Sequence, residues 1–333
     1  MVRLVEASDQ AIAEAAAILN AGGLVALPTE TVYGLGANAL DGVAVAKIFA
    51  AKGRPQINPL IVHGHSVEFL SAHVEFSDDA RLVAERFWPG PLTIILPRRA
   101  DCKISELCSA GLPTLAVRVP AHPVALKLLS AANCPVAAPS ANKSGSLSPT
   151  APMHVLQSLG DAVDMILASG PTQYGLESTV LDLSGDVPVI LRPGAITAED
   201  IAGILGKSVC YDLGDPHAKD AVKSPGQLLK HYAPNIPVRL NAVDVEPGEA
   251  LLAFGSLKFM GVRGGGFAKD LPAPQWRNLS DEGDLYQAAA NLFRMMRELD
   301  KPEHSRIAVM NIPDQGIGIA INDRLKRAAA ATA

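Results

Sequence analysis

LVALPTETVYGLGANA, residues 24–39, is the stretch around which the first half of this chain is expected to fold. Its opening apolar run is typical of a buried strand. Pro28 interrupts strand pairing, and the two glycines further on supply turn geometry. Between them, Thr29, Thr31 and Tyr33 occupy alternate positions, so in an extended chain two hydroxyls and a phenol would share one face. This pattern indicates either a lip that holds a small polar ligand or a solvated strand edge.

Composition narrows the class of protein. The chain has 333 residues, enough for about two domains, and its 48% hydrophobic share against 19% charged residues supports large buried cores. The formal charge of −5 and the 5% aromatic share disfavour extended binding to duplex or single-stranded nucleic acid. The four cysteines have no CxxC spacing, which disfavours a zinc site or a disulfide framework. Without an apparent signal peptide or membrane span, we expect a cytoplasmic protein.

Periodicity and breakers predict an α/β chain with two domains. We expect a first domain at 5–205, a linker at 206–237 and a small three-layer α/β domain at 238–331. Helices are predicted at 9–21, 42–51, 78–87, 123–132, 151–159, from 197, 285–299 and 317–330. Strands are predicted at 24–27, 92–96, 113–120, 135–138, 165–168, 178–183, 187–191, 251–254 and 307–310. A further strand is predicted to end at His63.

Two cations follow the second predicted helix. Lys52 and Arg54 lie two residues apart, on either side of a plausible left-handed cap at Gly53, and Pro55 prevents the helix from resuming. In an extended chain the pair could clamp a polyphosphate. Cations at a helix end also satisfy carbonyl groups and the helix dipole, so both interpretations stay open.

Other polar residues stand where predicted strands end. His63 and a second histidine form an HxH pair, but no further metal ligand is apparent, which favours a hydrogen-bonding histidine. Arg118 alternates with apolar residues and requires an anion, either a ligand carboxylate or an internal Asp or Glu. The small, hydroxyl-rich segment 139–145 could bind a nucleotide through backbone N–H groups or form a surface turn. Arg192 leaves a predicted hairpin at another strand end.

Together these stretches resemble one known family. The motifs are PTETVYGLG, KGRP with NPLIVH, LAVRVP, PSAN, ESTV, LRPG and SPG-x4-HYAP, which span residues 24–234, with DRL-x-RAA at 323–329. In this order they are similar to the long form of the threonylcarbamoyl-AMP synthase family. The resemblance implies a YrdC-type twisted open mixed sheet with flanking helices. It also implies a small Rossmann-like C-terminal domain and a linker that covers the active site.

The resemblance also implies an activity. Members of the family are nucleotidyltransferases that convert L-threonine, bicarbonate or CO2, and ATP into threonylcarbamoyl-AMP and pyrophosphate. This is the first step of N6-threonylcarbamoyladenosine formation in tRNA. We therefore expect Mg²⁺ to arrive with ATP, with no metal site from the protein alone. The expected downstream partners are tRNA threonylcarbamoyl-transfer proteins, without membrane association and without strong direct binding to nucleic acid.

Site residues follow from the resemblance by position in each motif. The residues implied to hold threonine are Thr31, His63, Arg118 and Ser178. The residues implied to contact the nucleotide are Lys52, Arg54, Asn58, Thr114, Ala138, Ser140, Ser148, Arg192 and Tyr232. Thr29 and Asn142 are further candidates. Tyr232 would close the linker over bound nucleotide as a strap, which would exclude water.

Three alternatives compete with this function. A YrdC-type domain could bind structured RNA through a concave basic face, although the acidic net charge counts against it. Carbamoyl transfer in hydrogenase maturation uses a related domain, but it calls for an acylphosphatase module and paired CxxC zinc fingers, which this sequence lacks. A regulatory role for the C-terminal domain is the third alternative.

Overall fold

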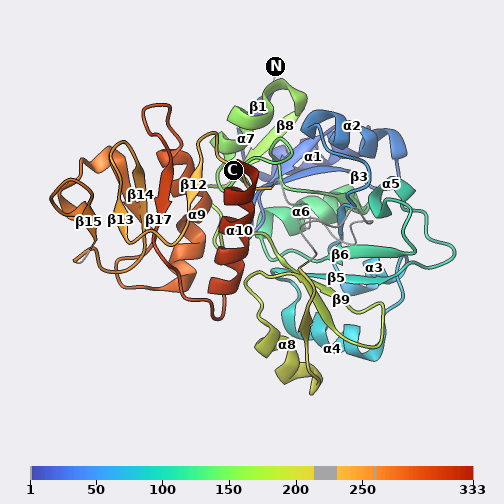
Figure 1. Cartoon of the computed structure of the whole chain (residues 1–333). Helices are drawn as coiled ribbons and strands as arrows, with labels where there is room; N and C mark the ends of the chain where they lie inside the picture. The colour runs from blue at the N-terminus through green and yellow to red at the C-terminus, as the bar shows by residue number, and fades with distance from the viewer. Residues whose placement is uncertain (1, 214–230, 259, 333) are drawn as a thin grey trace. The chain divides into compact units, whose positions relative to one another are not determined.

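The computed structural model describes residues 2–213, 231–258 and 260–332, and these divide into two compact units (Figure 1). Within the described residues, the first unit consists of 2–144, 149–173 and 177–213. The second unit consists of 145–148, 174–176, 231–258 and 260–332. Two short segments of the second unit thus interrupt the chain of the first. The SPG motif at 224–226, and with it most of the predicted strap, lies outside the described residues.

An 11-stranded mixed sheet forms the first unit, in the order β1-β8-β2-β3-β7-β4-β6-β5-β9-β10-β11. Its strands are β1 (Arg3–Glu6), β2 (Val25–Leu27), β3 (Gly34–Asn38), β4 (Ile61–His63), β5 (Leu92–Pro97), β6 (Thr114–Arg118), β7 (Val136–Ala137), β8 (Met165–Ala168), β9 (Thr179–Asp182), β10 (Val189–Arg192) and β11 (Cys210–Tyr211). The sheet contains both parallel pairs, such as β4 with β6, and antiparallel pairs, such as β5 with β6. The predicted mixed sheet is therefore confirmed.

Helices flank this sheet. They are α1 (Asp9–Asn20), α2 (Gly42–Lys52), α3 (Val67–Ser71), α4 (Asp78–Phe87), α5 (Glu106–Ser109), α6 (Pro123–Ala132), α7 (Pro152–Leu159) with the 3₁₀ turn η1 (Gly160–Ala162), and α8 (Ala198–Leu205). α2 begins where the Asp41 carboxylate accepts hydrogen bonds from Val43 and Ala44, and it ends at Gly53 with φ +58°. The predicted left-handed cap is confirmed, and its geometry turns the chain sharply after Lys52.

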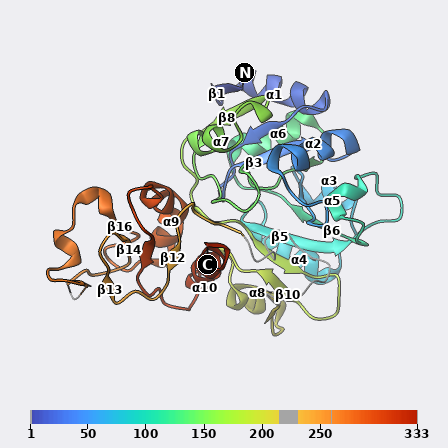
Figure 2. The same cartoon turned by 45° about the horizontal axis from the view of Figure 1, so that its top comes forward.

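The two faces of the sheet are covered differently. Side chains such as Val62, Val117 and Leu181 belong to a large core with residues of α2 and α4. Behind β2, β7 and β8 a second core packs against α1 and α6, which lie side by side in Figure 2. On the face of β4, β6, β5, β9 and β10 opposite the large core, a small cluster contains strand residues only: Ile61, Ile95, Ala116, Val180 and Leu191, with Val189 against them. This face carries the candidate site.

The segment after β2 differs from the extended conformation in which Thr29, Thr31 and Tyr33 would share one face. The chain turns there, and Tyr33 is fully buried, with its hydroxyl donating to the Gly170 carbonyl oxygen at 2.7 Å. The phenol therefore lies in the core instead of sharing a face with the two threonine hydroxyls. The reason is that the aromatic ring gains more from burial than from a solvated lip.

Some elements have weak sequence signals and were not predicted. β1, α3 and α5 are short and show little periodicity. β11 lies within the predicted linker range, where it pairs in parallel with β10 through Val189 and Cys210. A strand of two residues is too short to show an alternating side-chain pattern that the sequence could reveal.

The second unit is a small α/β fold. A four-stranded parallel sheet runs in the order β12-β17-β14-β16. Its strands are β12 (Val238–Arg239), β14 (Ala250–Ala253), β16 (Trp276–Asn278) and β17 (Ile307–Val309), and β13 (Asp244–Val245) pairs separately with β15 (Gly261–Val262). Its helices are α9 (Leu285–Leu299) and α10 (Gly318–Thr332), with 3₁₀ turns η2 (Ala268–Asp270) and η3 (Ala273–Gln275). α9 packs on β14 and β16, whereas α10 packs on β12.

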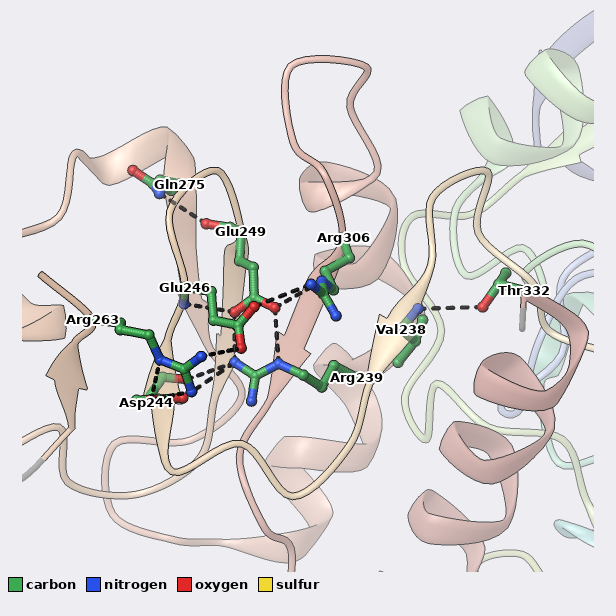
Figure 3. Close-up of polar contacts among 9 residues, drawn as sticks. All are labelled: Val238, Arg239, Asp244, Glu246, Glu249, Arg263, Gln275, Arg306 and Thr332. Atoms are coloured by element: carbon green, nitrogen blue, oxygen red, sulfur yellow. Dashed lines mark hydrogen bonds and ion pairs between the residues drawn. The ribbon is translucent and has the colours of Figure 1, made fainter.

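Figure 3 shows an ion network at the start of the strands in this unit. Glu249, which is fully buried, accepts hydrogen bonds from Arg239 at 2.8 and 2.6 Å and pairs with Arg306 at 3.1 Å. Asp244 pairs with Arg263 at 2.9 Å. Burial of Glu249 acts to raise its pKa, but the hydrogen bonds from Arg239 and the Glu246 backbone, together with the charges of Arg239 and Arg306, hold the pKa of Glu249 below its usual value. The charges neutralise one another, so the network stabilises the unit and offers no unpaired charge to a ligand.

No helix among the described residues has both the length and the apolar character needed to cross a bilayer.

Candidate active site

His63 and Arg118 are neighbours in the first unit. They are the last residues of the parallel strands β4 and β6, and they are directly paired in the register. Arg118 is buried, and its guanidinium donates to the Gly90 carbonyl oxygen at 3.1 Å and to the Glu30 carboxylate at 2.6 Å. Of the two anions that the sequence allowed for Arg118, the structure therefore supplies the internal one.

His63 is a neutral imidazole in this position. Burial, reinforced by the positive charge of Arg118, lowers the pKa of His63 to about 3. A neutral ring beside a guanidinium can donate or accept a hydrogen bond without adding a second positive charge. This suits a polar contact with a small substrate better than an ion pair.

The low pKa of His63 predicts how stability depends on pH. In the unfolded chain the histidine takes up a proton near its ordinary pKa of about 6.5, whereas the folded chain resists protonation down to about 3. Its contribution to stability is therefore complete above pH 6.5 and is lost as pH falls toward 3. The loss is at most about 1.4 kcal/mol per pH unit. Chemical denaturation of the wild type and His63→Asn between pH 7 and 5 measures it. The variant should show the shallower dependence, and equal slopes would contradict the assignment.

Ser178 and Arg192 form a second polar cluster on the same side of the sheet. The Ser178 hydroxyl lies 2.7 Å from the Thr93 hydroxyl and accepts from Arg192 at 3.0 Å, and Arg192 also donates to the Ser178 carbonyl oxygen at 3.0 Å. Gly194 passes so close that a Cβ there would lie 2.4 Å from the Thr179 nitrogen. Glycine is thus required for the chain to bring Arg192 beside Ser178.

Thr31 lies in the turn that also carries Glu30. Thr29 holds this turn: its hydroxyl donates to the Val32 carbonyl oxygen at 2.6 Å and accepts from the Thr31 and Val32 backbone at 3.2 Å each. The Thr29 and Thr31 hydroxyls are 2.8 Å apart. Since Glu30 pairs with Arg118, the turn is anchored beside the ends of β4 and β6. The structure therefore brings Thr31, His63 and Arg118 to one place.

Lys52 connects α2 to the segment 139–145. Its buried ammonium donates to the backbone carbonyl oxygens of Ser140 and Asn142, both at 2.5 Å, and its own carbonyl oxygen accepts from Ser144 at 2.8 Å. Burial and the charge of Arg54 lower the pKa of Lys52 well below its usual value, against the opposing charge of Glu177. Two of the three ammonium protons thus shape the loop that contains two predicted nucleotide contacts.

Arg54 and Asn58 lie just beyond α2. Arg54 donates to the carbonyl oxygens of Asn58 at 3.3 Å and Pro59 at 3.0 Å. The side-chain amide of Asn58 is fully buried, and neither its oxygen nor its nitrogen has a hydrogen-bond partner among the described residues. An unpaired buried amide costs on the order of 1–3 kcal/mol per group. Such a group is well suited to receive polar atoms of a ligand.

Three further predicted nucleotide contacts border this region. Thr114 begins β6 and so stands at the opposite end of that strand from Arg118. The Ala138 N–H donates to the Ile61 carbonyl oxygen at 2.9 Å, so it is already committed within the sheet. Ser140 forms an isolated bridge with Gly34. A long ligand would be needed to reach both ends of β6, since five strand residues span about 13 Å.

Ser148 and Tyr232 belong to the second unit. The chain at Gly145 accepts the Ala233 N–H at 2.8 Å, which ties the two segments together. Tyr232 is buried with φ +63°; its ring stacks on Phe293 at 5.4 Å, and the Arg324 guanidinium lies 5.3 Å from the ring centre. Arg324 was part of the C-terminal motif, and its packing against Tyr232 shows that the two motifs meet within this unit.

Asn142 is itself buried in the loop that Lys52 holds, and its side-chain amide donates to the Lys143 carbonyl oxygen at 2.9 Å. Within the described ranges, no group of three histidine, cysteine, aspartate or glutamate side chains is placed to hold a metal ion.

Comparison with known proteins identifies the family. Residues 17–194 match the Sua5/YciO/YrdC family model, described as "Telomere recombination", and residues 196–330 match "Threonylcarbamoyl-AMP synthase, C-terminal domain". Threonylcarbamoyl-AMP synthase of Pyrococcus abyssi is 40% identical over 321 residues, which cover 94% of this chain and 92% of the relative. The chain belongs to the threonylcarbamoyl-AMP synthase family.

A second relative and a crystal structure also match nearly the whole chain. The Bacillus subtilis protein of that name is 40% identical over 328 residues, covering 97% of this chain and 94% of its own length. The crystal structure of P. abyssi Sua5 complexed with L-threonine matches with a TM-score of 0.86 and 36% identity, covering 100% of this chain and 98% of that chain. The predicted family and fold are therefore confirmed.

Two members of the site were missed from the sequence. Glu30 lies inside the PTETVYGLG motif between two hydroxyl residues, and Thr93 lies in an apolar strand. A threonine among apolar strand residues carries no distinctive pattern. For Glu30 a signal existed, because a carboxylate two residues after Pro28 and between two threonines was a possible partner for Arg118.

Proposed function

We propose that this chain forms L-threonylcarbamoyladenylate and pyrophosphate from L-threonine, bicarbonate or CO2, and ATP. The observation that carries the proposal is a set of buried cations in the first unit, where the ends of β6 and β10 and of α2 bring positive charge into the interior. Arg118 and Arg192 are the last residues of β6 and β10, Lys52 ends α2, and Arg54 donates to the Pro59 carbonyl oxygen shortly before β4. The carboxylate of an amino acid and a polyphosphate, held next to each other, need such an arrangement. Membership of the threonylcarbamoyl-AMP synthase family selects this pair of substrates over other anions.

The reaction requires positioning and charge neutralisation. The threonine amine attacks CO2 to give an N-carboxylate, whose oxygen attacks the α-phosphorus of ATP, and pyrophosphate leaves. No enzyme nucleophile takes part in this sequence of steps. Arg118 would bind the amino-acid carboxylate, with Thr31, His63 and Ser178 as polar contacts. Preorganised cations stabilise the charge that develops on the phosphoryl oxygens.

The nucleotide would lie along the remaining predicted contacts. Arg54 and Lys52 would face its phosphates, and the unpaired amide of Asn58 would receive polar atoms of the nucleotide. Thr114, Ala138, Ser140, Ser148, Arg192 and Tyr232 are the other proposed contacts, with Thr29 and Asn142 supporting the loops.

Mg²⁺ would come with ATP as the MgATP substrate, bound through phosphate oxygens. The product would be passed to tRNA threonylcarbamoyl-transfer proteins, and this step in tRNA modification would place the protein in the cytoplasm. Exclusion of water from the labile adenylate would be required throughout.

Pyrophosphate release tests the proposal. Purified protein with MgATP and labelled bicarbonate should release pyrophosphate only when L-threonine is present, and the label should appear in an adenylate. L-serine and L-valine serve as controls, because each lacks either the methyl or the hydroxyl group of threonine. Release that is independent of the amino acid, or none with any amino acid, would contradict the proposed function.

A further inference from the structure

Only one of the two oxygens of the buried Glu30 carboxylate has a hydrogen-bond partner among the described residues. Its Oε1 accepts from Arg118 at 2.6 Å, and both side chains are only 4% exposed. Its Oε2 is buried and has no hydrogen-bond partner among the described residues. Likewise, no acceptor in the described part of the chain pairs with the Nη1 group of Arg118. The buried ion pair therefore leaves one acceptor and one donor unused.

We propose that Glu30 binds the α-ammonium group of the amino-acid substrate and accepts its proton before carboxylation. The inference rests on the proposed function, because it assigns a role within the same amino-acid site. A zwitterion carries a carboxylate for Arg118 and an ammonium for Glu30. It can thus replace each half of the ion pair with an equivalent partner.

The exchange keeps every buried charge paired. If a simple anion bound Arg118, Glu30 would be left buried without a counter-ion, which is strongly unfavourable. If a simple cation bound Glu30, Arg118 would be left in the same condition. The ion pair of the free protein therefore selects molecules that carry both charges close together, as an α-amino acid does.

Proton transfer follows from the same geometry. An ammonium has no lone pair, so it must lose one proton before its nitrogen can form the N–C bond to CO2. Overall, R–NH₃⁺ and CO2 give R–NH–COO⁻ and two protons. The first proton goes to the Glu30 carboxylate, and the second leaves the carbamic nitrogen for water. Glu30 returns its proton to water when product leaves, which restores the carboxylate for the next cycle.

The surrounding charges favour this assignment. Arg118 on β6 faces Glu30 directly, and the ring of His63 on β4 is neutral because its pKa is lowered to about 3. Burial lowers the pKa of His122, the residue before α6. The negative charge of Glu30 acts to raise that pKa, but it stays below its usual value. Both histidines are thus poorly suited to hold the proton of an ammonium, whereas the carboxylate carries the opposite charge and attracts it.

A binding experiment without ATP tests the ammonium contact. Titration calorimetry compares L-threonine with (R)-3-hydroxybutyrate, which lacks only the amino group, for the wild type and Glu30→Gln. The wild type should prefer threonine on the order of 100-fold, and the variant less than about tenfold. Glu30→Asp, which keeps the charge, should retain most of the preference. If Glu30→Gln weakens both ligands equally, Glu30 only positions Arg118 and the proposal fails.

Turnover tests the proton step. At saturating threonine and about pH 7, Glu30→Gln should release pyrophosphate about 100-fold more slowly than the wild type. This deficit should shrink toward pH 9, because more threonine then reaches the site as the neutral amine. Using the ratio of variant to wild type cancels the titration of groups that both share. A constant deficit across this range would overturn the proton step.

The two proposals can fail separately. If the wild type prefers threonine over (R)-3-hydroxybutyrate but never releases pyrophosphate, the amino-acid site stands and the proposed function is wrong. If threonine-dependent release occurs but Glu30→Gln leaves the preference intact, the function stands and the role of Glu30 is wrong.

Discussion

Arg118→Ala is expected to lower kcat/KM for L-threonine on the order of 1,000-fold while ATP affinity stays within about threefold. The variant loses the cation that would pair with the substrate carboxylate. It also leaves Glu30 buried without a counter-ion, which should cost about 3–5 kcal/mol of unfolding free energy. Threonine-dependent pyrophosphate release, ATP binding by titration and urea denaturation measure the three quantities.

The double variant Arg118→Ala/Glu30→Gln separates folding from binding. Replacing the orphaned carboxylate with a neutral amide should recover most of the lost stability but none of the threonine use. A double variant that regains turnover would show that Arg118 acts only through the fold. Equal losses of threonine and ATP binding in the single variant would contradict the separate amino-acid pocket.

Lys52→Met is expected to reduce kcat/KM for ATP between about 100- and 1,000-fold. Methionine keeps the volume of the buried side chain but removes both hydrogen bonds to the Ser140 and Asn142 carbonyl oxygens. The loop 139–145 would then lose its anchor to α2, and any phosphate contact of the ammonium would be lost as well. Steady-state kinetics with varied ATP, at saturating threonine, measures the effect.

Lys47→Met is the matched control. Lys47 lies on the same helix and also donates to a backbone carbonyl oxygen, that of Gly22 at 2.7 Å, but its contact does not involve the loop 139–145. This variant should keep the ATP kinetics of the wild type, and its stability should fall by no more than about 1 kcal/mol. If both lysine variants have the same KM for ATP, the loop does not position the nucleotide.

Much of the fold could be predicted from the amino-acid sequence. The helices α2, α4 and α6 repeat their apolar residues with helical spacing, and local caps such as Gly53 define their ends. The position of Arg118 in an apolar strand predicted that its guanidinium would pair with an anion. Membership of the threonylcarbamoyl-AMP synthase family was equally visible, because it depends on ordered local motifs. These properties are local: each is set by residues a few positions apart.

The partners of the site residues were not visible in the same way. Glu30 and Arg118 are 88 positions apart, as are Lys52 and Ser140, so only the packed sheet and its loops bring them together. Tyr33 alternated with two threonines in sequence, yet burial of its ring turned it into the core. Local spacing therefore determined which side chains carry chemistry. Long-range packing decided what each one faces, because a buried charge or ring takes the partner that the whole fold supplies.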